Sequence, residues 1–116
     1  MKIIHYTDVE PETVEEGAEG VSIRWIITER DGAPNFAMRH FEIAPGGHTP
    51  LHTHGWEHEV FILTGRGALV TDGGEKPFGP GTVIYLAPDE RHQFRAGAEE
   101  PVTMLCLIPS PKRCGL

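Results

Sequence analysis

Residues 46–65 read GGHTPLHTHGWEHEVFILTG and hold four of the seven histidines of the chain. His52 and His54 are two positions apart, so on an extended strand they project from the same face. His58 has the same parity, but six residues of straight strand would carry it about 20 Å from His52. Because a metal–imidazole bond is only about 2 Å long, three rings on one ion require a bend in the chain. We expect this bend at Gly55, since glycine tolerates the dihedral angles of a sharp turn.

Three imidazoles on one face indicate a metal site. Each neutral ring carries an acceptor nitrogen, and burying such polar groups without partners is costly. Two alternatives remain at this point: a solvent-facing histidine cluster, or core histidines that each bond to backbone.

Length and composition limit the class of protein. The 116 residues fit one domain, and 39% of them are hydrophobic, enough for a globular core. The formal net charge of -7 argues against nucleic acid or an anionic membrane as a partner. No apolar run approaches the roughly 20 residues of a membrane span, and the N-terminus lacks the apolar region of a signal peptide. With two cysteines there is no disulfide scaffold, so we expect a cytoplasmic protein.

Short apolar runs separated by glycine and proline predict an all-β chain. Residues 1–20 are acidic and lack hydrophobic periodicity, so we expect a solvated arm there, with one helical turn after Pro11. The remaining residues, 21–116, form the predicted domain. We expect its second strand to end at the APGG segment, and a further strand to lie in the histidine stretch. We expect the other strands over residues 21–28, 36–43, 58–63, 68–71, 82–86, 92–95 and 102–108.

Seven or eight short strands with turn signals about every ten residues favour an antiparallel sandwich or barrel. A metal site on inward-facing strand positions favours the closed double-sheet barrel, whose small interior would enclose the ion. Sequence signatures of acyl-transfer nucleophiles, phosphate loops and dinucleotide-binding turns are absent from the chain.

The histidine stretch resembles the first motif of the cupin family, G-x5-H-x-H-x3/4-E-x6-G. Gly46, His52 and His54 match this motif, and Gly65 matches its last position. His58 stands where the motif has glutamate. This exchange is similar to that in the small single-domain cupins with an all-histidine site, known as manganese-binding proteins.

The second cupin motif, G-x5-P-x-G-x2-H-x3-N, is matched only in part. Gly81 and His92 are in register. Ala87 replaces the proline, Asp89 the second glycine and Ala96 the asparagine. This partial match supports the resemblance because it follows the first motif, where the second motif lies in the family.

The resemblance implies a double-stranded β-helix, or jelly-roll, barrel and a divalent metal held by His52, His54, His58 and His92. It also implies manganese or iron, whereas by intrinsic affinity an all-imidazole site prefers copper, nickel or zinc. A closed structural zinc site is a further alternative, although such sites usually recruit cysteine.

Four neutral imidazoles leave the +2 charge of the ion uncompensated, which favours an anionic or chelating small-molecule substrate. Our first functional expectation is an oxygenase-type oxidoreductase that binds substrate and oxygen side by side. The alternatives are a metal-dependent isomerase or lyase, and a non-catalytic metal or small-ligand binding module. We also expect a homodimer, with the apolar strand VSIRWII supplying the contact.

Other residues offer weaker candidates for the site. We expect Arg39 in a surface salt bridge, with binding of an anionic substrate as the alternative. Cys106 should be ordinary core packing, or else lie near the metal and contact a ligand. Trp56 and Phe94 flank the candidate ligands and wall the pocket or pack in the core.

The remaining polar candidates belong to loops and outer positions. We expect outer-shell carboxylates to accept hydrogen bonds from ligand rings. The histidines outside the site should be structural or exposed, and one cysteine should lie in a tail with no role. The carboxylates are Glu57, Glu59 and Glu90; the histidines are His5, His40 and His48, the last also a candidate for contact with the ligands; the cysteine is Cys114.

Overall fold

The computed structural model describes residues 1–110, and these residues are almost entirely strand and loop. Cys114 and the rest of the expected tail lie outside the described residues. The described elements are, in chain order, the 3-10 helix η1 (Tyr6–Asp8), β1 (Glu12–Val14), β2 (Glu19–Ile27), the 3-10 helix η2 (Glu29–Asp31), β3 (Phe36–His48), β4 (His58–Thr64), β5 (Gly67–Thr71), β6 (Gly74–Phe78), β7 (Val83–Leu86), β8 (His92–Ala96) and β9 (Val102–Pro109). The all-β prediction is confirmed.

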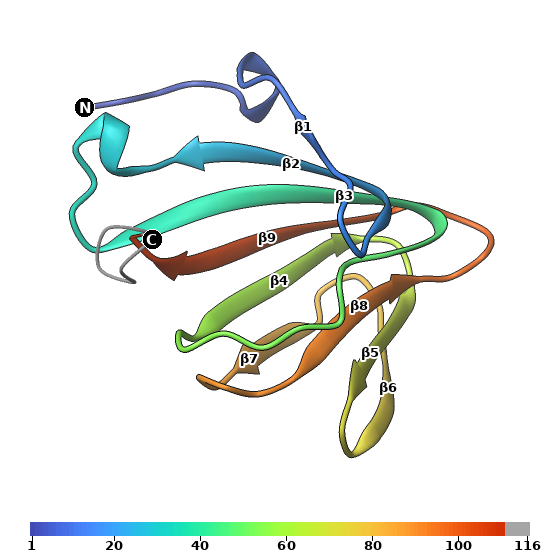
Figure 1. The fold of residues 1–116 in the computed structure, drawn as a ribbon. Coiled ribbons are helices and arrows are strands. Elements are labelled where there is room, and N and C mark those ends of the chain that lie inside the picture. The colour runs from blue at the N-terminus through green and yellow to red at the C-terminus, as the bar shows by residue number, and fades with distance from the viewer. Residues whose placement is uncertain (111–116) are drawn as a thin grey trace.

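The strands form one curled antiparallel sheet in which the hydrogen-bonded order is β6-β5-β8-β3-β9-β4-β7, with β2 added to β3 and β1 to β2. Figure 1 shows that the sheet curls so that β2, β3 and β9 lie in one layer and β5, β7 and β8 in the other. The result is an antiparallel half-barrel, consistent with the jelly-roll fold expected from the sequence. Most contacts join residues that are distant in the sequence. For example, β8 and β9, which come late in the chain, lie on either side of β3.

β3 is longer than the sequence indicated. We expected the strand to end before the APGG segment, but it continues through this segment to His48. Its first part pairs with both β2 and β9, whereas His48 pairs with Glu19 of β2 and with Arg95 of β8. β3 therefore joins the two layers, and propensity alone misses this because Pro45 and the two following glycines are poor strand formers.

The strand expected within the histidine stretch is not formed. Between β3 and β4 the chain makes one isolated bridge, in which His52 pairs with His92. The expected bend is present at Gly55 and Trp56. However, Gly55 is not among the glycines with positive φ, so the bend does not depend on a glycine-only conformation.

The N-terminal segment contributes strand structure that its composition did not predict. Residues 12–14 form β1, which pairs with β2, where we expected a helical turn after Pro11. The ring of Tyr6 stacks on the buried His40 at a centroid distance of 4.4 Å. Short pairing of this kind is decided by the partner strand rather than by local sequence.

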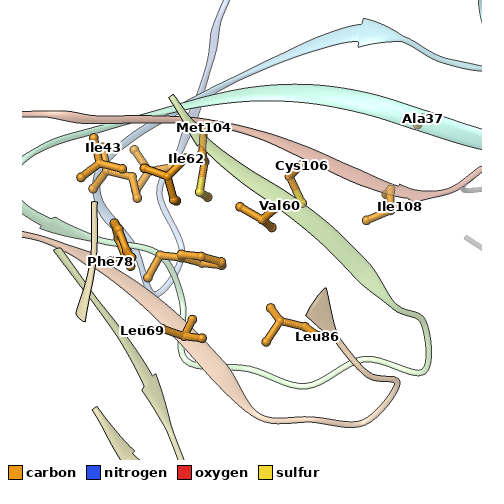
Figure 2. Close-up of a cluster of buried hydrophobic side chains, with 13 residues drawn as sticks. Ala37, Ile43, Val60, Ile62, Leu69, Phe78, Leu86, Met104, Cys106 and Ile108 are labelled. Atoms are coloured by element: carbon orange, nitrogen blue, oxygen red, sulfur yellow. The ribbon is translucent and has the colours of Figure 1, made fainter. Parts of the chain in front are cut away.

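The core lies between the two layers and follows alternation most regularly along β4 and β9. In β9 the even-numbered residues from 102 to 108 are buried, and in β4 His58 shares its inward face with Val60 and Ile62. Figure 2 shows Ile43, Ile62 and Met104 gathered at one end of this cluster and Ile108 at the other. The period of two therefore turns the ring of His58 inward with the core.

Within residues 1–110, the described structure includes no helix with the length and apolar character that crossing a bilayer requires.

Candidate metal centre

Backbone pairing brings two of the histidines opposite each other. The N–H of His52 donates to the carbonyl of His92 over 3.2 Å, and the N–H of His92 donates back to the carbonyl of His52 over 3.1 Å. His54 lies two residues further on, and its carbonyl accepts from the N–H of Asp89 over 2.8 Å. The loop that carries His52 and His54 is thus fixed to the loop before β8.

The four rings form one cluster. His52 lies 4.4 Å from His54 and 4.9 Å from His92 between ring centroids, and His54 lies 4.5 Å from His58. His92 lies 5.2 Å from His54 and 5.1 Å from His58. The structure therefore brings together the four side chains that the cupin resemblance implied as ligands.

The ring nitrogens fit a divalent ion. One nitrogen each from His52, His54 and His92 lies within 4.8 Å of the other two. Two imidazole nitrogens on one ion are at most about 4.2 Å apart, because each bond is about 2.1 Å long. These three histidines could therefore hold a metal ion with small side-chain movements. His58 lies next to these three, with its Nε2 3.0 Å from Nε2 of His54, although it is not one of the three histidines whose nitrogens all lie within 4.8 Å of one another.

A hydrogen bond on the outer side of the ring sets the tautomer of His92, and His58 has a contact in the corresponding position. Nδ1 of His92 lies 2.8 Å from the carbonyl oxygen of Glu90 and must donate to it, which leaves Nε2 as the free acceptor. Nδ1 of His58 lies 3.2 Å from Sγ of Cys106. Fixing one nitrogen as a donor in this way prepares the other to bind a metal.

The rings are neutral at ordinary pH. Burial lowers the pKa of His52 to about 4 and that of His58 to about 3, and the positive charge of Arg39 and the neighbouring rings adds to the effect. Burial also lowers the pKa of His54 and of His92. A neutral imidazole keeps its lone pair available, so protons compete weakly with a metal here.

Arg39 is buried beside the cluster, and its expected surface salt bridge is wrong. The residue is only 9% exposed, and the guanidinium lies over the rings of Trp25 and Phe41 at 5.2 and 4.9 Å. Nη2 lies 2.9 Å from Sγ of Cys106 and 3.4 Å from Nδ1 of His58. Alternation along β3 explains this position, because residue 39 shares the inward face of Ala37 and Ile43.

A cavity of about 400 Å³ opens beside the cluster. Its polar wall consists of the four histidines, Arg39, Cys106 and two threonines, and no aspartate or glutamate of the described residues lines it. The remaining wall is apolar and rich in aromatic rings; it consists of Val14, Ile23, Trp25, Phe41, Pro50, Trp56, Phe94, Met104 and Ile108. Such a wall suits a mainly apolar organic molecule.

The expected outer carboxylates do not support the rings. Glu57 and Glu59 are exposed, and the carboxylate of Glu90 accepts from the N–H of Ala87 instead. Glu90 nevertheless contacts His92 through its backbone carbonyl. The sequence led us to expect the side chain of Glu90 as the acceptor. The backbone carbonyl could not be predicted, because every residue type has one.

The other histidines lie outside the cluster. His5 is exposed and caps η1, and His40 packs against Tyr6. Nδ1 of His48 lies 3.1 Å from the carbonyl oxygen of Thr49 and 3.3 Å from the side-chain Nε2 of Gln93. Sequence reasoning also missed the aromatic faces around Arg39, although their parity on β2 and β3 could have indicated them.

This geometry defines a small all-β protein with a histidine site on an inward face. The family model described as a cupin domain matches residues 39–108, more than half of the chain. The chain therefore belongs to the cupin family.

The chain is similar in sequence to two enzymes whose activities are known by name. The chain is 37% identical over 71 residues to 1-methylthio-D-xylulose 5-phosphate methylsulfurylase of Rhodospirillum rubrum, a match that covers 61% of this chain but only 46% of that protein. It is 29% identical over 91 residues to L-ectoine synthase of Vibrio campbellii, with 78% of this chain and 70% of that protein covered.

Among solved structures, the polyketide cyclase RemF of Streptomyces resistomycificus is similar over most of the chain. The TM-score is 0.88 and the identity 39%, with 94% of this chain and 79% of that chain covered. A predicted oxalate decarboxylase of Thermotoga maritima has a TM-score of 0.84 at 20% identity, with 94% of this chain and 99% of that chain covered, and shares the fold.

Proposed function

We propose that this protein is a metal-dependent cyclase or lyase that closes a ring in a small carbonyl compound of the polyketide type with loss of water. The observation that carries the proposal is the contact between the four-histidine cluster and an apolar cavity of about 400 Å³. The similarity to a polyketide cyclase supports the reaction class and the substrate type.

His52, His54, His58 and His92 would hold the ion. A divalent metal on neutral imidazoles keeps its full charge and supplies Lewis-acid polarisation of a carbonyl group. Manganese and iron remain proposals from the family resemblance, since the donor set also suits zinc, nickel and copper.

The chain itself would supply orientation, exclusion of water and a positive field. Trp25, Phe41 and Trp56 form flat apolar walls on which a conjugated substrate can lie. The fixed charge of Arg39 favours the enolate form of a β-dicarbonyl compound over its neutral form. Holding an extended chain in a folded conformation brings the reacting carbons together and lowers the entropic barrier.

The oxygenase activity that we expected first is not among the activities named for these relatives. We therefore place it below the cyclase or lyase reaction, which needs no oxidant. A small-molecule partner and a homodimer also remain proposals. Sedimentation of the purified protein tests the second. Exposed apolar side chains that bear on it lie on β4 and β7, namely Phe61, Leu63, Val83 and Tyr85, and on β2 at Ile27.

The test uses an aryl triketone as a mimic of a poly-β-ketone, incubated under nitrogen with the purified metal-containing protein. We expect a product lighter than the substrate by one water. Chelator-treated protein and the His92→Ala variant should not form it. Product formation that requires oxygen would favour the oxygenase, and tight binding without turnover would favour the binding module; either result contradicts the proposal.

A further inference from the structure

Arg39 carries a buried positive charge that no acidic side chain within residues 1–110 balances. The ion pairs in the described residues join Lys2 to Asp31 and His48 to Glu19, and neither involves Arg39. Its polar contacts are Sγ of Cys106 and Nδ1 of His58. A thiol and an imidazole are neutral in their ordinary forms at pH 7, so these contacts offer no formal negative charge. Buried charges in proteins are normally paired.

The guanidinium also has unused donors. Both contacts come from Nη2. Two buried side-chain nitrogens in residues 1–110 have no partner, Nε of Arg39 and Nε1 of Trp56, and both residues line the cavity. Unpartnered buried N–H groups are costly and therefore rare. Their presence around one cavity indicates that a ligand rich in acceptors completes the site.

Two aromatic rings hold the guanidinium in place. Trp25 lies opposite Arg39 in the register of β2 and β3, and Cys106 lies opposite it in the register of β3 and β9. The Phe41 ring lies 4.9 Å away on the same strand face. A guanidinium fixed in this way presents its donors without losing much side-chain entropy on binding.

From this arrangement we propose that the cavity takes an organic anion, a β-keto carboxylate or β-dicarbonyl enolate, whose charged oxygen is received by Arg39. This inference rests on the proposed function for the substrate skeleton and adds the charge of the substrate and the residue that selects it. Arg39 is then a specificity-determining residue beside the histidine cluster, which it contacts at His58. The aromatic wall receives the uncharged part of the molecule.

Benzoylacetate and its methyl ester test the proposal, because they differ mainly in charge. Calorimetric titration of the full chain, both metal-containing and chelator-treated, should show the carboxylate binding about 10- to 100-fold more tightly than the ester, as for a hydrogen bond to a charged group. Arg39→Met should abolish this preference in both forms, and Arg39→Lys should retain part of it. Arg24→Met is the matched control, because Arg24 bonds to backbone carbonyls on the outer side and should leave the preference unchanged.

Equal binding of the two probes by the wild-type protein, or failure of the carboxylate to bind, overturns the proposal. Retention of the preference in Arg39→Met overturns it too, since the metal would then be the anion receptor. If the Met variant does not fold, the wild-type ratio and the Lys variant decide. The proposed cyclisation is judged separately, because loss of water from the triketone can fail while the charge preference persists, and the reverse.

Discussion

Sγ of Cys106 lies 3.2 Å from Nδ1 of His58, on the side of the ring turned away from the other histidines. Cys106 is 2% exposed, and its sulfur also accepts a hydrogen bond from Nη2 of Arg39. For Nε2 of His58 to bind a metal as a neutral ring, Nδ1 must carry the proton, and the sulfur is then its acceptor. Cys106 thus acts in the place usually taken by a carboxylate or carbonyl oxygen.

Cys106→Ala removes this acceptor, and we expect metal affinity to fall about 10- to 100-fold, the usual effect of losing an outer partner of a ligand. Cys106→Ser keeps an acceptor of similar size and should retain most of the affinity. Competition with a chromophoric chelator measures both variants. Equal affinities for Ala and Ser would show that the sulfur serves packing alone.

Direct ligation is tested by substitution of His92. His92→Ala removes one nitrogen of the cluster, and we expect the purified protein to lose its bound metal or to bind it at least about 100-fold more weakly. His48→Ala is the matched control, because His48 is half-buried on β3 but lies outside the cluster. Elemental analysis of both variants gives the metal content. Unchanged content in His92→Ala would contradict the four-histidine site.

Much of the fold could be predicted from residue patterns, because alternation in strands is a local property. The period of two in residues 58–63 and 102–108 placed both strands, whereas β6 was not among the expected strands. β1 and the end of β3 could not be predicted. Their pairing depends on strands distant in the sequence, and proline and glycine in β3 masked the signal.

The candidate site, too, could be predicted only in part from the sequence. The spacing of His52 and His54 and the bend before His58 indicated a cluster, and only the family resemblance added His92. The burial of Arg39 was missed because charged residues are seldom buried, and its parity with Ala37 is visible only once the inward face of β3 is known.

Gly55 and Gly65 should differ in their tolerance of a side chain. A Cβ on Gly55 meets nothing within 4 Å and its φ is not positive, so Gly55→Ala should change the free energy of unfolding by less than about 1 kcal/mol and leave metal content intact. Gly65 has a φ of 87°, and a Cβ there would collide with the carbonyl of Pro101. We expect Gly65→Ala to cost more than about 2 kcal/mol, measured by urea unfolding. A cost for Gly55→Ala as large as the one expected for Gly65→Ala would show that the bend at Gly55 does require glycine.

The stability of the metal-free protein should depend on histidine protonation. Burial holds the pKa of His58 at about 3 and that of His52 at about 4 in the folded chain, below their ordinary value of 6.5. At a pH between the lowered pKa values and 6.5, the unfolded chain binds more protons than the folded chain, so lowering the pH favours unfolding. The free energy of unfolding should therefore fall as the pH drops from about 6.5 towards 4, by up to about 1.4 kcal/mol per pH unit for the buried His58.

Urea unfolding of chelator-treated protein at pH 7, 6 and 5 measures this slope. His58→Gln keeps a polar side chain of similar reach that does not titrate, so its slope should be shallower than that of the wild-type protein. Comparing slopes rather than absolute stabilities removes the cost of the substitution itself and the contribution of carboxylates, which both proteins share. Parallel slopes for the two proteins would mean that the ring of His58 is solvated and protonates freely, and that the inward position described for it is not the one adopted without metal.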